Sequence, residues 1–464
     1  MKKSCPGKFG LKEAGSLTLT FCLLLPVVFS LLIVLFDFSM ESRKDLDLTR
    51  WLAANLEVNL AAFDRQLWQD FGLLALNETP FSTVSSTHFD NEAEVSLQGE
   101  SSLYEPGNLK EEILRHMKIR FPAELITGIA GRIRDLGAFD FEGSIDTILS
   151  SDGCREAKDL LQGGEAVPDD VEWKEELDEY IDAEINSLYE DVVSSLMPVH
   201  IYDEQGDVTG GGKLDFFDPE SMSRIAAFID ETLAAPENTS LDKLYLASYA
   251  LDYFPAVVEG RIVDNKMIPR LTPDGRSHAD LLPQRSGEAE EIITGSRGDK
   301  AGKEVRAVLI VVRSIIQLIH HFQDESLRNR YKIYAGIIVA AVAAISAGSV
   351  SLPLEAVEYL LLLADAVLDG RREAVRLQEG HGVSFWPGKN DGSLVLYYHD
   401  YLLLFLIIQK EEALLSRFKT IISRHNPGPG WVWLSATTNH TGKAITFDGG
   451  YLSGRYRYAA EGAK

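Results

Sequence analysis

The adjacent residues His320 and His321, followed by Asp324, have the spacing nearest to a metal site in this chain. Imidazole nitrogens and carboxylate oxygens are both ligands for zinc. Adjacent side chains on a helix, however, point about 100° apart. Neither an HExxH nor a CxxC pattern accompanies these residues. The spacing therefore favours an exposed helix face over a zinc site.

The other residues capable of chemistry also favour structural roles. His399 and Asp400 lie in an aromatic and leucine-rich stretch, which predicts a hydrogen-bonded core histidine. Cys154 stands alone, and no GxSxG or SxxK pattern supplies a nucleophile with its base. The acidic segment 169–191 lacks the pattern of a calcium loop, and the glycines at 210–212 lack that of a phosphate loop. We predict an amphipathic helix and a linker there, and no catalytic, metal or cofactor site, so the protein is not expected to be an enzyme.

The composition is that of a folded, acidic protein. Its 464 residues are 45% hydrophobic, enough for a sizeable core, and carry a formal net charge of −25. Phosphate binding needs clustered lysine and arginine, so we expect no nucleic acid among its partners. Cys5 and Cys22 lie before or inside the first apolar segment, which leaves Cys154 without an intramolecular disulfide partner in the main domain.

Residues 16–36 form an uncharged apolar run of 21 residues. As a helix the run measures about 31 Å, which matches a bilayer core of about 30 Å. A signal peptide has a shorter run followed by small residues, whereas this run continues into Asp37 and Glu41. We therefore predict a retained, single-pass helix in the cell membrane. Lysines in the tail 1–15 place that tail in the cytoplasm and the main domain outside, by the positive-inside rule.

The helix is expected to continue as an amphipathic stem over residues 37–78. Between residues 16 and 71 there is no glycine, and Pro26 is the only proline. Apolar residues recur at spacings of three or four on one helical face: Leu52, Leu56, Leu60, Phe63, Leu67 and Phe71. Gly72 offers a C-terminal stop. We predict that this face packs on the rest of the domain; a coiled coil with another subunit is the alternative.

Residues 79–426 are predicted to form a mainly helical extracytoplasmic domain. Its first part, 79–108, is polar and predicts a loop with one strand near 93–97, before a helix that starts near Leu109. Two apolar runs, at 333–354 and 394–408, are predicted to be buried helices. If 333–354 spanned the membrane instead, the C-terminus would return to the cytoplasm.

Residues 427–464 are predicted to form a small C-terminal antiparallel β-sheet. After the sequence PGPG the pattern alternates and predicts strands at 431–435, 443–447 and 451–458, with a hairpin turn at 448–450. The predicted fold class is therefore α+β, mainly α.

An apolar helix that continues into a globular head is the layout of pilin-like proteins, and several stretches extend this resemblance. They are GSLTLTF at 15–21, ESR at 41–43, AAFDRQL at 61–67, DFGLL at 70–74, ILRHMKIRFP at 113–122, GEAEEIITG at 287–295 and YHDYLL at 398–403. In this order they resemble a domain family of unknown function from Gram-positive bacteria. Members of that family are encoded with tight-adherence (Tad, or Flp) pilus machinery and are similar to the TadE and TadG pseudopilin-like proteins.

The resemblance departs from the pilin pattern at one position. Pilins carry a glutamate at the fifth position after the glycine where prepilin peptidase cuts, whereas counting from Gly15 gives Thr20. We therefore expect no cleavage after Gly15.

The resemblance implies a membrane-anchored structural or accessory protein of a Tad-type pilus or secretion apparatus. Its partners would be the lipid bilayer and other components of that machinery. The alternative is an extracytoplasmic sensor or adhesion domain unrelated to pilus assembly. Genes for a secretion ATPase and Tad inner-membrane proteins nearby would distinguish the two.

Overall fold

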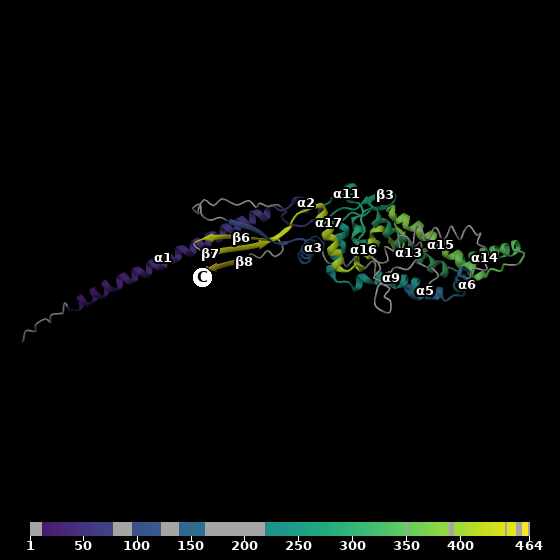
Figure 1. Ribbon diagram of the computed structural model, residues 1–464, viewed down its shortest axis with the longest axis horizontal. Helices are drawn as coiled ribbons and strands as arrows, with labels where there is room; N and C mark the ends of the chain where they lie inside the picture. Colours follow the sequence, from purple (N-terminus) through teal and green to yellow (C-terminus); the bar gives the residue numbers. More distant parts are fainter. Residues whose placement is uncertain are drawn as a thin grey trace, which may run out of the picture. The chain divides into compact units, whose positions relative to one another are not determined.

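The computed structural model describes most of the chain (Figure 1). The described residues are 12–77, 95–121, 139–162, 219–348, 350–388, 394–440, 443–451 and 457–462. They are mainly helical with small antiparallel sheets, which confirms the predicted class at this coarse level. The predicted acidic helix at 169–191 and the predicted linker at 210–212 lie outside the described residues.

The chain divides into two compact units. Unit 1 comprises Met1–Asp64, Leu74–Leu103 and Pro429–Lys464, and unit 2 comprises Arg65–Leu73 and Tyr104–Gly428. Both ends of the chain therefore belong to unit 1, and most of unit 2 is an insertion between them.

Unit 1 consists of one long helix and one four-stranded antiparallel sheet. The helix α1 spans Lys12–Ala61, and the strands are β1 Val95–Ser102, β6 Trp431–His440, β7 Lys443–Gly450 and β8 Arg457–Gly462. Their order is β1-β6-β7-β8. The strand expected near 93–97 thus runs from 95 to 102, and it pairs with the C-terminal strand β6.

The second half of α1 packs on β6 and β7 of this sheet (Figure 1). Leu48, Leu52 and Leu56 are fully buried, at spacings of four that place them on one helical face. They form a core with side chains of the C-terminal strands, namely Leu434, Ala436 and Ile445. Alternate residues of a strand share one face, so Leu434 and Ala436 both point toward the helix.

The helix α1 ends earlier than predicted. The continuous helix expected to reach Phe71 stops at Ala61, and a second helix, α2 Arg65–Phe71, belongs to unit 2. No glycine or proline marks this end; instead, Tyr451 donates a 2.6 Å hydrogen bond to the Leu60 carbonyl, and the Asp64 N–H donates to Ala75 at 2.9 Å. A distant tyrosine thus takes one of the last carbonyl groups of the helix, and the chain beyond the helix pairs with Ala75; local spacing reveals neither contact.

The predicted stop at Gly72 is confirmed as the end of α2. Gly72 has φ +67° and donates its N–H to the Trp68 carbonyl. A Cβ at this position would lie 2.5 Å from the His116 ring and 2.6 Å from the Tyr253 hydroxyl. Both the backbone angle and the close packing therefore require glycine.

The hairpin turn predicted at 448–450 is wrong, because β7 continues through Gly450. Asp448 accepts a 2.7 Å hydrogen bond from Ser435 on the neighbouring strand, and Gly450 pairs with Trp433. A Cβ on Gly450 would lie 2.4 Å from the Trp433 ring. The glycine serves close packing within the sheet, and the β6–β7 connection falls between His440 and Lys443 instead.

The described part of unit 2 is helical apart from two short ribbons. Besides α2, its helices are α3 Pro106–Arg120, α5 Phe141–Leu149, α6 Asp152–Gln162, α9 Pro219–Asn238, α10 Leu241–Tyr253, α11 His278–Arg285, α12 Glu288–Thr294, α13 Asp299–Gln323, α14 Glu325–Ile345, α15 Leu354–Gln378, α16 Tyr398–Ile408 and α17 Glu411–His425. The ribbons pair β2 Gly260–Val263 with β3 Lys266–Pro269, and β4 Val383–Ser384 with β5 Val395–Leu396. The helix α13 is buried along most of its length and packs on α15.

We predict that Leu52→Ala lowers the free energy of unfolding of unit 1 by about 2–5 kcal/mol, because it removes a buried side chain and leaves a cavity against the sheet. Thermal melts of the detergent-solubilised chain measure the effect. Phe63→Ala, at a partly exposed position beyond the helix end, is the control and should lower the free energy of unfolding by less. A normal melt of the Leu52 variant combined with lost self-association would make this face a subunit contact.

Candidate functional site

The first half of α1 is the feature of the chain that most needs a partner. From Phe21 to Phe36 its large apolar side chains are exposed on every side of the helix. A helix that is apolar all round is stable only when it is buried in protein or lipid. Its uncharged run of 21 residues is long enough to cross a bilayer core.

Only one other described helix is long and apolar enough to cross a membrane, and it lies inside unit 2. This helix is α13, whose apolar window is mostly buried. The run predicted to be a buried helix at 394–408 is one only in α16; the short strand β5 precedes this helix, and its Val395 is 46% exposed. Within the described residues, α1 is therefore the only exposed candidate span.

The buried helix predicted at 333–354 is wrong. This segment is the end of α14, a turn and the start of α15. Ala335 is its only fully buried residue in α14, whereas Ile333, Ile337 and Ile345 are 64%, 61% and 87% exposed. The reason is that α14 lies at the edge of unit 2, where it packs mainly on α13 and α15.

The same segment is also too short to cross a membrane as one helix. The Gly348 N–H donates to the Ala343 carbonyl at 2.8 Å, and Ala347 and Gly348 both have positive φ. This arrangement ends the helix. The apolar part from Ile333 to Ile345 measures about 20 Å, against a bilayer core of about 30 Å.

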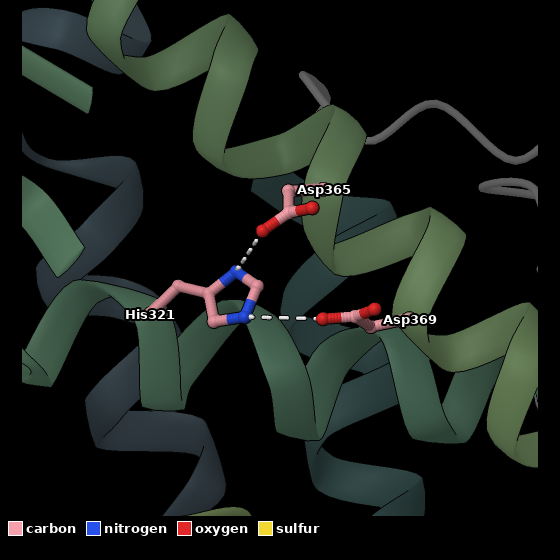
Figure 2. Close-up of side chains that lie close together, drawn as sticks. All are labelled: His321, Asp365 and Asp369. Carbon is pink, nitrogen blue, oxygen red and sulfur yellow. Dashed lines mark ion pairs between the residues drawn. The ribbon is translucent and has the colours of Figure 1, made fainter. Parts of the chain in front are cut away.

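Away from α1, one group of side chains among the described residues has the composition of a metal site. Figure 2 shows the imidazole of His321, from the last turn of α13, between the carboxylates of Asp365 and Asp369 on α15. His321 Nδ1 lies 4.0 Å from Asp365 Oδ2, and Nε2 lies 3.8 Å from Asp369 Oδ2. The two aspartates are four residues apart, which places both on the face of α15 toward His321.

Two further side chains hold the carboxylates in place. The Tyr331 hydroxyl of α14 donates a hydrogen bond to Asp365 Oδ2, and Arg372 Nη1 lies 2.9 Å from Asp369 Oδ1. Burial and the neighbouring Asp365 carboxylate raise the pKa of Tyr331, so this phenol stays a hydrogen-bond donor at neutral pH.

The residues that suggested a metal site in the sequence do not come together. The His320 ring lies near Trp386, and Asp324 caps α14 by accepting hydrogen bonds from Ser326 and Leu327. The exposed helix face predicted for these residues is wrong at His321, which is buried, and of the three residues only His321 contributes to the cluster. The pair Asp365 and Asp369 has a recognisable spacing in the sequence, but nothing local connects it to a histidine 44 residues earlier.

The other sequence candidates have structural positions. His399 is buried and forms a hydrogen bond with the Val258 backbone. Burial lowers the pKa of His399 to about 3. These observations confirm the predicted hydrogen-bonded core histidine. Asp400 accepts a 2.8 Å hydrogen bond from the Tyr397 N–H and so caps α16. Cys154 is buried in α6 and forms no disulfide within the described residues.

Sequence analysis missed the three buried glutamates of α12. Glu288 pairs with Arg285 at 2.8 Å, and Glu291 pairs with Arg424. Glu290 faces no cation; it accepts hydrogen bonds from the Val257 N–H and the Tyr398 hydroxyl, while its second carboxylate oxygen has no partner. Burial raises the pKa of Glu290 to about 7.

A second buried charge lies in the middle of α13. Arg313 is fully buried, and its guanidinium donates to Glu373 at 2.7 Å, to the carbonyls of Ser384 and Phe385, and to the Tyr401 hydroxyl. All of these partners come from other elements. The arginine therefore fastens α13 to α15, β4 and α16.

Compared with known proteins, the chain matches no family model, no curated sequence and no solved structure. Its function therefore has to be argued from its own residues.

We predict that Glu290→Gln stabilises unit 2 more at pH 8 than at pH 4. The pKa of Glu290 is about 7 when folded and 4.5 otherwise, so the folded chain holds a proton that the unfolded chain releases, and stability falls as pH rises through this range. Glutamine cannot ionise. The difference in free energy of unfolding between the variant and the wild type should therefore change by about 3 kcal/mol between pH 4 and pH 8. Denaturant unfolding at both pH values measures it; the exposed Glu111→Gln is the control, and parallel pH profiles would contradict the prediction.

Arg313→Met should destabilise unit 2 by about 3–5 kcal/mol, because it leaves the Glu373 carboxylate and two carbonyl groups without their donor. Arg313→Lys should recover little, since one ammonium group cannot reach the same set of acceptors. Arg306→Met, at a half-buried position on the same helix, is the matched control. Equal unfolding midpoints for the Arg313 and Arg306 variants would count against this role.

Proposed function

We propose that the protein is a membrane-anchored, extracytoplasmic structural or accessory subunit of a Tad-type pilus or secretion apparatus, similar in layout to pseudopilins. The observation that carries the proposal is the double character of α1. Its first half exposes apolar side chains all round, and its second half is buried on one face against a sheet. The proposal assigns no catalytic activity to the chain.

This layout is what a pilin-like role requires. The apolar half can be held by lipid or by the equivalent helices of other subunits, while the sheet keeps the head folded on the same helix. The likeness is one of layout and therefore supports the role by analogy. The ordered stretches that resemble the Tad-associated family, such as GSLTLTF at 15–21, support it independently.

The proposed orientation rests on charge. Lys2, Lys3, Lys8 and Lys12 precede the apolar run, so the tail should stay in the cytoplasm and the two units should lie outside. Unit 2 would then be the part available to other components of the apparatus.

A deletion strain tests the role directly. Surface pili or secreted products of the Tad machinery should be lost on deletion and restored by the full chain. A version with residues 1–36 replaced by a cleavable signal peptide is the matched control and should not restore them, because it releases both units from the membrane. Normal pili in the deletion strain would favour the sensor or adhesion alternative.

Protease accessibility on intact cells should find residues after about 45 exposed outside. The apolar helical part of 333–354 is too short to span, so Lys464 should be accessible on the same side. Protection of Lys464 with exposure of unit 2 would establish a second crossing.

Mass spectrometry of the membrane-extracted protein should place the N-terminus at or near Met1, because position 20 carries threonine where pilins have glutamate. A mature terminus at Ser16 would show that prepilin peptidase accepts Thr20. That result would move the protein from accessory factor to pilus subunit.

A further inference from the structure

We propose that the exposed face of α14 packs antiparallel on the same face of a second copy of this chain. This α14 face carries five large apolar side chains that are open to water: Ile333, Tyr334, Ile337, Ile338 and Ile345. All five belong to unit 2. The inference therefore depends neither on the proposed membrane anchor nor on a role in a pilus.

The concentration of apolar surface on one helix is the first argument. The exposed fractions of the five side chains run from 37% to 87%. No other element in the described part of unit 2 exposes more than two large apolar side chains. Single exposed apolar residues are normal on a protein surface, whereas a contiguous group of them marks a contact site. The α14 face is therefore expected to be covered in the working protein.

The shape of the face selects the occupant. Residues three or four apart share one side of a helix, so Ala341 and Ala344 lie on the same side as Ile333 and Ile337, and both alanines are exposed. The face is thus bulky in its first half, at Ile333 and Tyr334, and small in much of its second half. In an antiparallel pair centred near residue 338, the bulky half of each copy lies opposite the alanines of the other. Such a face fits its own copy, which is the requirement for a two-fold contact.

The charges of α14 favour the same arrangement. Arg330 is exposed and lies three residues before Ile333, at the beginning of the face. The last turn of α14 contains no basic residue, so no side chain of its own balances the negative end of the helix dipole. Antiparallel packing brings Arg330 of each copy to that end of the other. Parallel packing would instead place the two arginines side by side, where they repel.

A lipid surface fits this face less well. The Asp365 carboxylate beside α14 accepts a hydrogen bond from Tyr331, and its side chain is 30% exposed. Carrying an ionised carboxylate toward the acyl chains is costly, whereas at a protein contact it can stay in water at the rim.

The size of the face sets the strength of the contact. Its apolar part is about 20 Å long and one helix wide, which is smaller than the roughly 800 Å² that each partner buries in a standard interface. We therefore expect a weak, reversible pair, with a dissociation constant of about a micromolar or weaker.

Disulfide cross-linking of the full chain in intact cells tests the pairing, with a membrane-permeant thiol oxidant and non-reducing gels. The three native cysteines are first replaced, Cys5 and Cys22 by serine and the buried Cys154 by alanine. Ile338→Cys should then form a covalent dimer, because residues near the two-fold axis meet their own copies and a disulfide needs Cα atoms within about 7 Å.

Two matched cysteines locate the contact. In the antiparallel pair, the two copies of Ile345→Cys would lie about 21 Å apart along the helices and should not cross-link. Leu368→Cys, at a 45% exposed position on α15, should not cross-link either. Pairing through α1 or by chance collision would favour position 338 over neither of them.

Surface variants in the Ile338→Cys background test the chemistry. Ile337→Asp should lower the cross-linked fraction about 10-fold or more, because it places a carboxylate in the apolar contact. Arg330→Glu should lower this fraction about 5-fold, because it puts a negative charge at the negative end of the other helix. Lys332→Glu, on the opposite side of α14 by helical spacing, is the matched control and should have no effect. All three positions are exposed, so the melting temperature should stay that of the parent chain.

Three results would overturn the proposal: no dimer from Ile338→Cys, equal dimer from the cysteines at 338, 345 and 368, or a dimer at 338 that Ile337→Asp does not reduce. An Ile338→Cys chain that forms no dimer yet resists a water-soluble thiol reagent would show that lipid or another protein covers α14. Loss of pili in the deletion strain is a separate measurement, so either proposal can fail without the other.

Discussion

Leu48, Leu52 and Leu56 of α1 are fully buried against Leu434 and Ile445 of the C-terminal strands. This contact joins the N-terminal helix α1 to the C-terminal strands β6 and β7. The strand β1 then pairs with β6 in the same sheet. Just beyond the ends of these two strands, the Leu103 N–H donates to the Gly430 carbonyl at 2.6 Å. Everything between Tyr104 and Gly428 must leave the sheet and return to it, so the larger unit folds as an insertion.

The same helix has two different surroundings along its length. From Phe21 to Phe36 the large apolar side chains of α1 are exposed on every side, and from Leu48 onward one side is buried. Water cannot accommodate the first half, and the sheet cannot cover it, because the sheet already packs on the second half. The candidates to cover this half are a bilayer or a bundle of equivalent helices. The proposed function starts from this helix for that reason.

Unit 2 combines an apolar helical core with charged groups that lie deep inside it. Arg313 and Glu288 are compensated by ionic partners from other elements, and Glu290 is compensated by hydrogen bonds in part only. Such groups specify which helices are neighbours, because each is stable only with its own partners in place. His321 differs from them: its ring lies between two carboxylates, with Nδ1 4.0 Å from Asp365 and Nε2 3.8 Å from Asp369.

The sequence alone determined the features that depend on local composition and period. An uncharged run of 21 residues predicts an apolar helix, alternation after residue 430 predicts strands, and Gly72 predicts a helix end. Each follows from a rule that acts over a few residues. The structure confirmed the helix, the stop and the first two strands, which extend to His440 and Gly450. It moved the hairpin turn out of 448–450, and the third strand is described at Arg457–Gly462, whereas 451–458 was predicted.

Only the tertiary structure decided which of these elements meet. The end of α1 at Ala61 depends on Tyr451, almost 400 residues later, and the pairing of β1 with β6 joins opposite ends of the chain. The exposure of α14 follows from its edge position, which its Ala-rich composition does not encode. His321 acquired its two aspartates in the same way, because the packing of α13 on α15 joins residues whose separation in sequence carries no period.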